Sequence, residues 1–469
     1  MRQRLVLFGV LALSMAGMAA CSSTNSNVSS QGDAATGDGA LPSDAGTADA
    51  TAEASLPAAE AGGNDAASDA DAAPETPADA AADGATGAGS VGPYLTLSYT
   101  FDSFNDSAYA VFNPTTGEAL GSLTYAQFGT NLSSNASPWV LEQFNDLVLQ
   151  MDPVEPWKIQ SSWSVVEPPP ESLEAGAAPY GDAFSVAEVG TKAYVALFTR
   201  DYVAVLDTST KADGGAPLAS ISLSQFVGDA DVDHGLEAIA VFYDTTQNLV
   251  WVVLGNTDQA VSSASFPYVT CVPGFHPLVA AIDPATDTIV SGKTYSLSGF
   301  DVFPATAVAF DQANDRLLVA SQGCSNVTDE SDGSVNVGPT VNSYVEALSL
   351  STGTDTILLN PAPPGASALV YVDGTHAFIQ SNNGVNAWNP TQTTVGALVP
   401  NAPEAIVWDG QGHLLGPTMT LLTDGGTSFA LISVDPTDGG VITLATNPFT
   451  PAPDPSSFTW EGLDLWPRP

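Results

Sequence analysis

The chain has 469 residues, of which 52 are Asp or Glu and only nine are Lys or Arg, so its formal charge is −43. Such an excess of negative charge repels nucleic acid and anionic lipid surfaces, which excludes both as partners. The length allows either two or three average domains or one large closed β fold.

The first 20 residues have the pattern of a cleaved export signal. Arg2 and Arg4 precede an apolar stretch that begins at Leu5, and small residues lead to Cys21. The apolar stretch is too short to span a membrane. Cleavage before Cys21 removes two of the nine basic residues, which leaves seven and a formal charge of −45.

Residues 18–21 (Met-Ala-Ala-Cys) resemble a bacterial lipobox, although leucine is commoner than methionine at the first position. The resemblance implies a lipid on Cys21, and Ser22 directly after it implies the outer membrane of a Gram-negative cell. We therefore expect an exported protein held at the outer membrane or cell surface by lipid alone. Ordinary secretion after another small residue is the alternative.

Residues 21–92 are predicted to form a disordered tether. After Cys21 they are almost entirely Ala, Asp, Gly, Ser, Thr, Pro and Glu, with twelve acidic side chains and no Lys, Arg or aromatic residue. Such a composition cannot bury enough apolar surface to offset the entropy lost on ordering. A flexible coil of about 70 residues reaches roughly 45 to 50 Å, which would hold a domain well away from a membrane.

From residue 93 to residue 469 the sequence predicts an all-β domain. Short runs of Val, Ile, Leu, Tyr and Phe alternate with turn residues. One hairpin with a turn resembling Asp-Pro-Thr-Gly recurs seven times, at 110–123, 147–159, 203–221, 278–292, 345–359, 385–398 and 430–444. Asp or Asn bonds the backbone ahead of such a turn, Pro presets φ, and Gly accepts a positive φ.

A second strand pair precedes most of these hairpins, at 238–256, 306–322, 368–382 and 405–417. Four strands repeated at this spacing predict a β-propeller blade, and seven hairpins predict seven blades. Because residues 125–139 contain no convincing inner strand, a ring of six or eight blades remains an alternative. The last segment, 457–467, looks like an inner strand, whereas the first blade lacks one, so we expect the two chain ends to pair and close the ring.

The arrangement resembles the YVTN-type seven-bladed propellers of exported bacterial and archaeal proteins. The matching residues are Ala-Tyr-Val-Ala-Leu-Phe at 193–198 and the Asp-Pro turns that begin at Asp283 and Asp435. This resemblance implies a fold and says almost nothing about activity.

The long insertions fall in two classes of loop, those between blades and those that join the second and third strands of a blade. Both classes open on one side of a propeller, which we call the elaborated face; the opposite side, with short turns, is the trimmed face. Cys271 and Cys324 lie in equivalent loops of blades four and five, so we expect a disulfide between them, with two buried thiols as the alternative. Binding sites generally lie on such loops.

Three carboxylates, Glu237, Glu404 and Glu461, lie near the starts of inner strands and are expected at the mouth of the central channel. Asp229, Asp231 and Asp233 alternate ahead of Glu237, as in the first half of a calcium loop, although the spacing is not that of an EF-hand. Carboxylates gathered in this way repel one another unless they are protonated or bridged by a cation, and calcium suits oxygen ligands. These six residues are the predicted metal ligands; a solvated acidic loop is the alternative.

The run Glu-Ala-Ile-Ala from Glu237 resembles the inner strand of propeller hydrolases, the lactonase and esterase-like phytase groups. This resemblance implies a calcium ligand at Glu237 and, as an alternative function, a calcium-dependent hydrolase. The chain lacks a nucleophile elbow, a phosphate loop and a dinucleotide fingerprint, and no catalytic residue is predicted. The preferred hypothesis is a monomeric, envelope-anchored binding or interaction module, and the sequence leaves open whether it has any enzymatic activity. Its partner would be an envelope protein, a polysaccharide or a small ligand.

Overall fold

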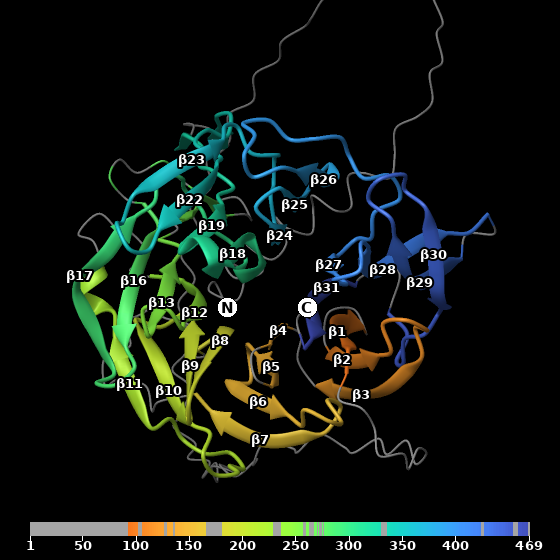
Figure 1. Ribbon diagram of the computed structural model, residues 1–469, viewed down its shortest axis with the longest axis horizontal. Coiled ribbons are helices and arrows are strands. Elements are labelled where there is room, and N and C mark those ends of the chain that lie inside the picture. Colours follow the sequence, from red (N-terminus) through yellow and green to blue (C-terminus); the bar gives the residue numbers. More distant parts are fainter. Residues whose placement is uncertain are drawn as a thin grey trace, which may run out of the picture. The chain divides into compact units, whose positions relative to one another are not determined.

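The computed structural model describes residues 92–101, 106–125, 129–134, 137–165, 181–227, 236–256, 259–261, 267–269, 271, 274, 276–329, 335–423, 426–453 and 458–467. These residues form an all-β propeller of seven blades arranged around a central axis (Figure 1). The predicted fold class and number of blades are confirmed. The predicted signal peptide, lipid-modified Cys21 and tether lie outside the described residues.

Each blade is an antiparallel sheet whose strands follow one another from the axis outward. Blade one contains β31 (Trp460–Trp466), β1 (Tyr94–Phe101), β2 (Asp106–Phe112) and β3 (Ala119–Tyr125). Blade two contains β4 (Thr130–Ser134), β5 (Pro138–Glu142), β6 (Leu147–Met151) and β7 (Ile159–Ser164). Blade three contains β8 (Ala183–Val189), β9 (Lys192–Leu197), β10 (Tyr202–Asp207) and β11 (Ala219–Ser222), followed by the short helix η2 (Ser224–Phe226).

Blades four and five carry extra hairpins. Blade four contains β12 (Ala238–Asp244), β13 (Leu249–Leu254), β16 (Leu278–Asp283) and β17 (Thr288–Ser296), with the hairpin β14 (Gln259–Val261) and β15 (Pro267–Val269). Blade five contains β18 (Val308–Asp311), β19 (Arg316–Ala320), β22 (Val345–Ser349) and β23 (Asp355–Leu359), with the hairpin β20 (Val327–Asp329) and β21 (Val335–Val337) and the short helices η3 (Ala305–Ala307) and η4 (Gln312–Asn314).

Blade six has three regular strands, β24 (Ala368–Asp373), β25 (His376–Ser381) and β26 (Gly384–Trp388). Its predicted outer strand is reduced to a single bridge between Asn386 and Leu398. Blade seven contains β27 (Val407–Trp408), β28 (Leu414–Leu421), β29 (Thr427–Val434) and β30 (Val441–Thr446).

The recurring turns have the predicted chemistry. The carboxylate of Asp283 accepts a hydrogen bond from the backbone N–H of Ala285 at 2.9 Å, and Asp435 accepts one from Thr437 at 2.7 Å. The glycine that ends the second of these turns, Gly439, has φ of 73° and donates its N–H to the carbonyl of Asp435. A positive φ is easy for glycine, which explains why it recurs at this position.

The ring is closed by the two ends of the described chain, as predicted. Strand β1 pairs with β31 from Tyr94 opposite Trp466 to Tyr99 opposite Trp460. Blade one therefore takes its inner strand from the C-terminal end and its other three strands from the N-terminal end, which leaves no unpaired inner edge at the join.

The inner strand of blade two, β4, escapes prediction from the sequence pattern because it is polar (Thr-Asn-Leu-Ser-Ser). Two of its polar side chains bond to the neighbouring inner strand, whereas Leu132 packs against an apolar cluster. The hydroxyl of Ser133 donates to the carbonyl of Val186 at 3.1 Å, and the amide of Asn131 donates to the carbonyl of Ala183 at 3.3 Å. Hydrogen bonds between inner strands thus replace the apolar signal on which the prediction relies.

The apolar core is divided among the seven seams between neighbouring blades. Seven clusters of buried side chains in the described residues lie at these seams. Six of them join two adjacent blades, and the cluster between blades four and five also includes Phe184 and Phe198 of blade three. In β13, for example, Val250 and Val252 pack toward blade three, whereas Trp251 and Val253 pack toward blade five. Because both faces of a strand are buried, the sequence is continuously apolar there rather than alternating.

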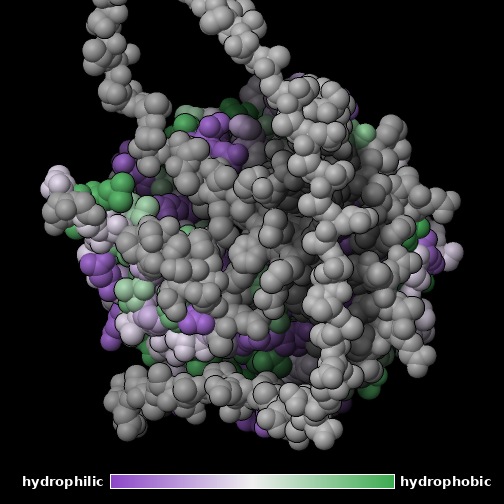
Figure 2. All heavy atoms as spheres, turned by 180° about the vertical axis from the view of Figure 1, so that it is seen from behind, coloured by the Kyte–Doolittle hydropathy of each residue, from purple (hydrophilic) through white to green (hydrophobic). Residues whose placement is uncertain are grey.

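The surface mixes polar and apolar residues. Figure 2, which shows the molecule from behind, has hydrophilic and hydrophobic residues interspersed over its coloured part. Exposed large apolar side chains such as Leu218, Ile357 and Leu421 belong to different blades. Within the described ranges, no helix has the length and apolar character needed to cross a membrane.

The closure predicts that substitutions at two leucines will differ greatly in their effect on the free energy of unfolding. Leu97 is fully buried in the closing strand β1, opposite Leu463, whereas Leu421 is 64% exposed. Leu97→Ala should lower the free energy of unfolding in urea by about 2 to 5 kcal/mol because it leaves a cavity at the join. Leu421→Ala, the matched control, should stay within about 0.5 kcal/mol of the wild type. A loss at Leu97 as small as that at Leu421 would contradict the closure.

Candidate functional site

The elaborated face carries two extra hairpins that are joined covalently. Hairpin β14–β15 interrupts the loop between β13 and β16, and hairpin β20–β21 interrupts the equivalent loop of the next blade. The predicted disulfide between Cys271 and Cys324 is confirmed, with their Cα atoms 5.1 Å apart. The backbone N–H of Cys271 also donates to the carbonyl of Ser325 at 3.3 Å. The two loops therefore form one stapled surface that spans blades four and five.

The three predicted channel carboxylates do not occupy equivalent positions. Glu237 directly precedes β12, is 4% exposed and has a positive φ of 40°, and its carbonyl accepts the N–H of Gly255 at 2.8 Å. Glu461 is the second residue of β31, at a bulge where the register with β1 shifts. The corresponding bulge of β12 contains Ile239, so Glu237 lies two positions before the residue that matches Glu461.

Both carboxylate oxygens of Glu461 already accept hydrogen bonds from residues outside its own strand. One oxygen accepts the N–H of Gly129 at 2.6 Å, and the other accepts the hydroxyl of Ser107 at 2.8 Å and the N–H of Thr130 at 3.2 Å. Since Gly129 and Thr130 begin the inner strand of blade two, Glu461 links blade one to blade two.

Glu404 has a similar role at the next seam. One of its oxygens accepts the N–H of Met419 at 3.1 Å, and the other accepts the indole N–H of Trp460 at 2.8 Å. Glu404 belongs to blade seven and Trp460 to blade one, so this carboxylate supports the ring closure. Protein donors thus satisfy both oxygens of Glu404, as they do those of Glu461.

The described residues contain no group of three or more His, Cys, Asp and Glu side chains close enough to hold a metal ion. Asp229, Asp231 and Asp233 lie outside the described residues, so the structure shows nothing of their contacts. Calcium coordination by these residues together with Glu237 stays a prediction.

Further carboxylates, which the sequence pattern did not single out, have the same function at other seams. Glu346 of blade five accepts the N–H of Ser298 at 2.9 Å and that of Gly299 at 3.1 Å, both from the loop that leaves blade four. Glu188 of blade three accepts the N–H of Ser137 of blade two at 3.0 Å. The available signal was an acidic residue inside an apolar strand, as in Val-Glu-Ala-Leu-Ser.

Burial raises the pKa of several of these groups. It raises the pKa of Glu461 to about 7, against the effect of its three hydrogen bonds, and that of Glu142 in blade two to about 7. The pKa of Glu346 is raised well above its ordinary value, mainly by burial and to a smaller extent by the negative charge of the neighbouring Asp355. At Glu461 and Glu142 burial disfavours the charged carboxylate more than the hydrogen bonds favour it, so the pKa is raised.

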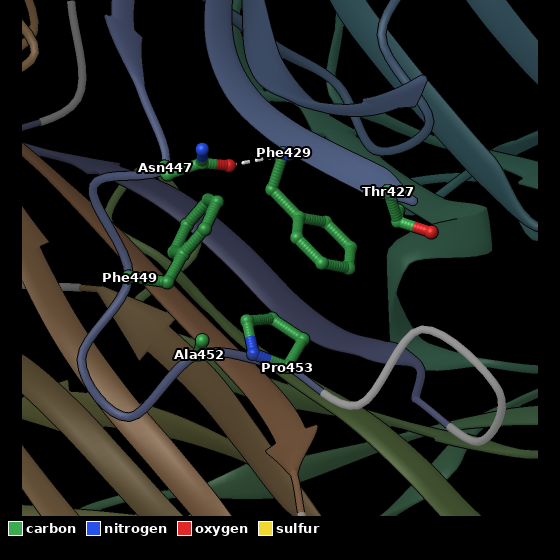
Figure 3. Close-up of a pocket in the computed structure, with 6 residues that line it drawn as sticks. All are labelled: Thr427, Phe429, Asn447, Phe449, Ala452 and Pro453. Atoms are coloured by element: carbon green, nitrogen blue, oxygen red, sulfur yellow. Dashed lines mark hydrogen bonds between the residues drawn. The ribbon is translucent and has the colours of Figure 1, made fainter. Parts of the chain in front are cut away.

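A pocket opens at the elaborated end of blade seven, beside the join with blade one. Its volume is about 340 Å³, and it is lined by Thr427, Phe429, Asn447, Phe449, Ala452 and Pro453. The rings of Phe429, Phe449 and Pro453 surround the hollow (Figure 3). No sequence signal marks this pocket, because its aromatic residues are also the expected components of a core.

Known proteins resemble this chain in fold but not in sequence. No protein-family model matches the chain, and no curated protein sequence matches it. A structure from Bacteroides uniformis, named as a candidate 6-phosphogluconolactonase, is 11% identical over 79% of this chain and 98% of its own, with a TM-score of 0.46. The periplasmic gluconolactonase PpgL of Pseudomonas aeruginosa is 13% identical over 80% and 99%, with a TM-score of 0.41. AztD of Citrobacter koseri is 12% identical over 80% and 99%, with a TM-score of 0.40. At these identities the likeness concerns the propeller fold alone.

The raised pKa values predict that the protein is more stable in mild acid than in mild base. An acid with a raised pKa in the folded chain binds its proton more tightly there than in the unfolded chain, so folding is favoured while that proton is bound. For Glu142 and Glu461 this stabilisation is complete below about pH 4.5 and is lost as the pH rises through about 7. The free energy of unfolding in urea should therefore fall steadily from pH 5 to pH 8.

A matched pair of variants isolates the contribution of Glu461. Glu461→Gln cannot ionise, so the decline between pH 5 and pH 8 should become shallower, whereas Glu118→Gln, at an exposed position, should keep the wild-type slope. A stability that rises with pH would contradict the raised pKa values. Equal slopes in the two variants would show that Glu461 does not titrate in this range.

Proposed function

We propose that the protein is an envelope-anchored binding or interaction module whose binding surface is the elaborated face. The observation that carries this proposal is the disulfide between Cys271 and Cys324, which fastens two long hairpin-bearing loops into one surface. Closing a loop of 53 residues lowers the entropy of the unfolded chain, so the link stabilises the folded state in which the two loops are joined. Loops held in this way on a rigid scaffold are a common binding architecture.

The charge of the chain restricts the partner. A formal charge of −45 after export disfavours anionic partners, so an envelope protein, a polysaccharide or a small ligand without net negative charge fits best. Lipid at Cys21 and the tether of residues 21–92 would let the propeller sample neighbouring molecules at the outer membrane or cell surface.

A calcium-dependent hydrolase is less well supported. That function would require Glu237, Glu404 and Glu461 to share a cation. Both oxygens of Glu404 and of Glu461 already accept hydrogen bonds from protein donors, and a shared cation would compete with these donors. The binding role asks for no such rearrangement.

The proposal is tested by capture from envelope extract with two matched surface variants. Val337 and Val341 are exposed on the elaborated face in the loop of blade five, and Val441 and Ile442 are exposed at the start of β30, next to the trimmed face. The wild-type chain and the variant Val441→Lys/Ile442→Lys should capture the same envelope component. Val337→Lys/Val341→Lys should lose it, because two cations would replace apolar contacts.

Both variants must first show the wild-type melting temperature, so that a loss of capture reports the surface and not the fold. Failure of the wild-type chain to capture any component would contradict a binding module. Equal capture by both variants would contradict the assignment of the elaborated face.

A further inference from the structure

The walls of the pocket in blade seven pack against a buried cluster of aromatic side chains. Phe429 and Phe449, each 5% exposed, form its walls. Both rings pack on Trp460, with centroids 6.0 Å and 5.3 Å from the indole. Phe449 also packs edge-on against Tyr99 at 5.3 Å. Because these rings belong to the buried cluster that closes the propeller, the walls are rigid before any ligand arrives.

Hydrogen bonds fix the rim of the pocket. The side-chain oxygen of Asn447 accepts the N–H of Phe429 at 2.9 Å, and the hydroxyl of Tyr99 donates to the carbonyl of Pro451 at 2.9 Å (Figure 3 shows the first). The first bond joins the segment that follows β30 to β29. The second joins the same segment to the closing strand β1. A preformed hollow of this kind loses little entropy when it binds a ligand.

The lining determines the ligand chemistry. None of the six lining residues is ionisable, and only Thr427 and Asn447 have polar side chains. In Figure 3 the hydroxyl of Thr427 lies at the edge of the hollow, and the oxygen of Asn447 is already bonded. A sugar would leave most of its hydroxyl groups unpaired in this pocket, which is costly. A flat apolar ring would find ring walls on several sides.

We propose that this pocket binds a small uncharged molecule through a flat apolar ring packed against Phe429 and Phe449. This inference rests on the proposed binding function and names one class of ligand for it. The negative charge of the chain selects against anionic rings of the same size. The volume of about 340 Å³ lies at the small end of ligand pockets, so a fused bicyclic ring with one small substituent ring fits.

The probe for this site is N-phenyl-1-naphthylamine, a neutral aromatic amine whose fluorescence rises in apolar surroundings. The mature chain should bind it saturably. Ala452→Trp would place an indole in the hollow from its exposed rim and should weaken binding by about tenfold or more. Ala285→Trp, on an exposed turn of the trimmed face, is the matched control and should bind as the wild type does. The anionic analogue 1-anilinonaphthalene-8-sulfonate should bind at least about tenfold more weakly than the neutral probe.

Several results would overturn the inference: no saturable binding by the wild-type chain, equal binding by Ala452→Trp and Ala285→Trp, or tighter binding of the anionic analogue. These failures are separable from failure of the proposed function. If the probe does not bind while envelope capture persists and depends on Val337 and Val341, the pocket assignment is wrong and the binding module stands.

Discussion

The pairing of β1 with β31 is the constraint on which the rest of the structure depends. A blade has two apolar faces, so it needs a neighbour on each side, and only a closed ring gives every blade two neighbours. The closure joins segments about 360 residues apart in sequence through the register from Tyr94–Trp466 to Tyr99–Trp460. Without it, the cluster between blades seven and one, the Glu461 contacts and the pocket walls would all be lost.

A second constraint comes from the scarcity of cations. With 52 acidic and nine basic residues, the chain has few Lys or Arg side chains that could pair with its buried carboxylates. Glu461, Glu404, Glu346 and Glu188 instead accept hydrogen bonds, mostly from backbone or indole N–H groups of the neighbouring blade. Each such contact satisfies two polar groups at a seam and orders the loop that supplies the donor. Burial raises the pKa of Glu461 and Glu346 despite these hydrogen bonds, so we expect the stability of the fold to depend on pH.

The sequence predicted the parts of the fold that local chemistry determines. The turn at Asp283 and the closing strand near Trp460 follow from turn residues and apolar patterns, and both were found as predicted. The polar strand from Thr130 was missed because hydrogen bonds between inner strands leave no apolar period. Glu237 and Glu461 were predicted to be equivalent because the residue at which each strand begins and bulges has no sequence signature here. The pocket depends on how distant segments meet, and residue types alone do not reveal this.

Hydrogen–deuterium exchange of the native chain tests the closure most directly. Amides of Leu95–Phe101 and of Trp460–Trp466 should exchange as slowly as those of the inner strands β8 and β12, because all of them open only when the ring unfolds as a whole. Rapid exchange at Trp460–Trp466 while β8 and β12 remain protected would show that the C-terminal strand is not part of the ring, and closure by the two chain ends would be disproved.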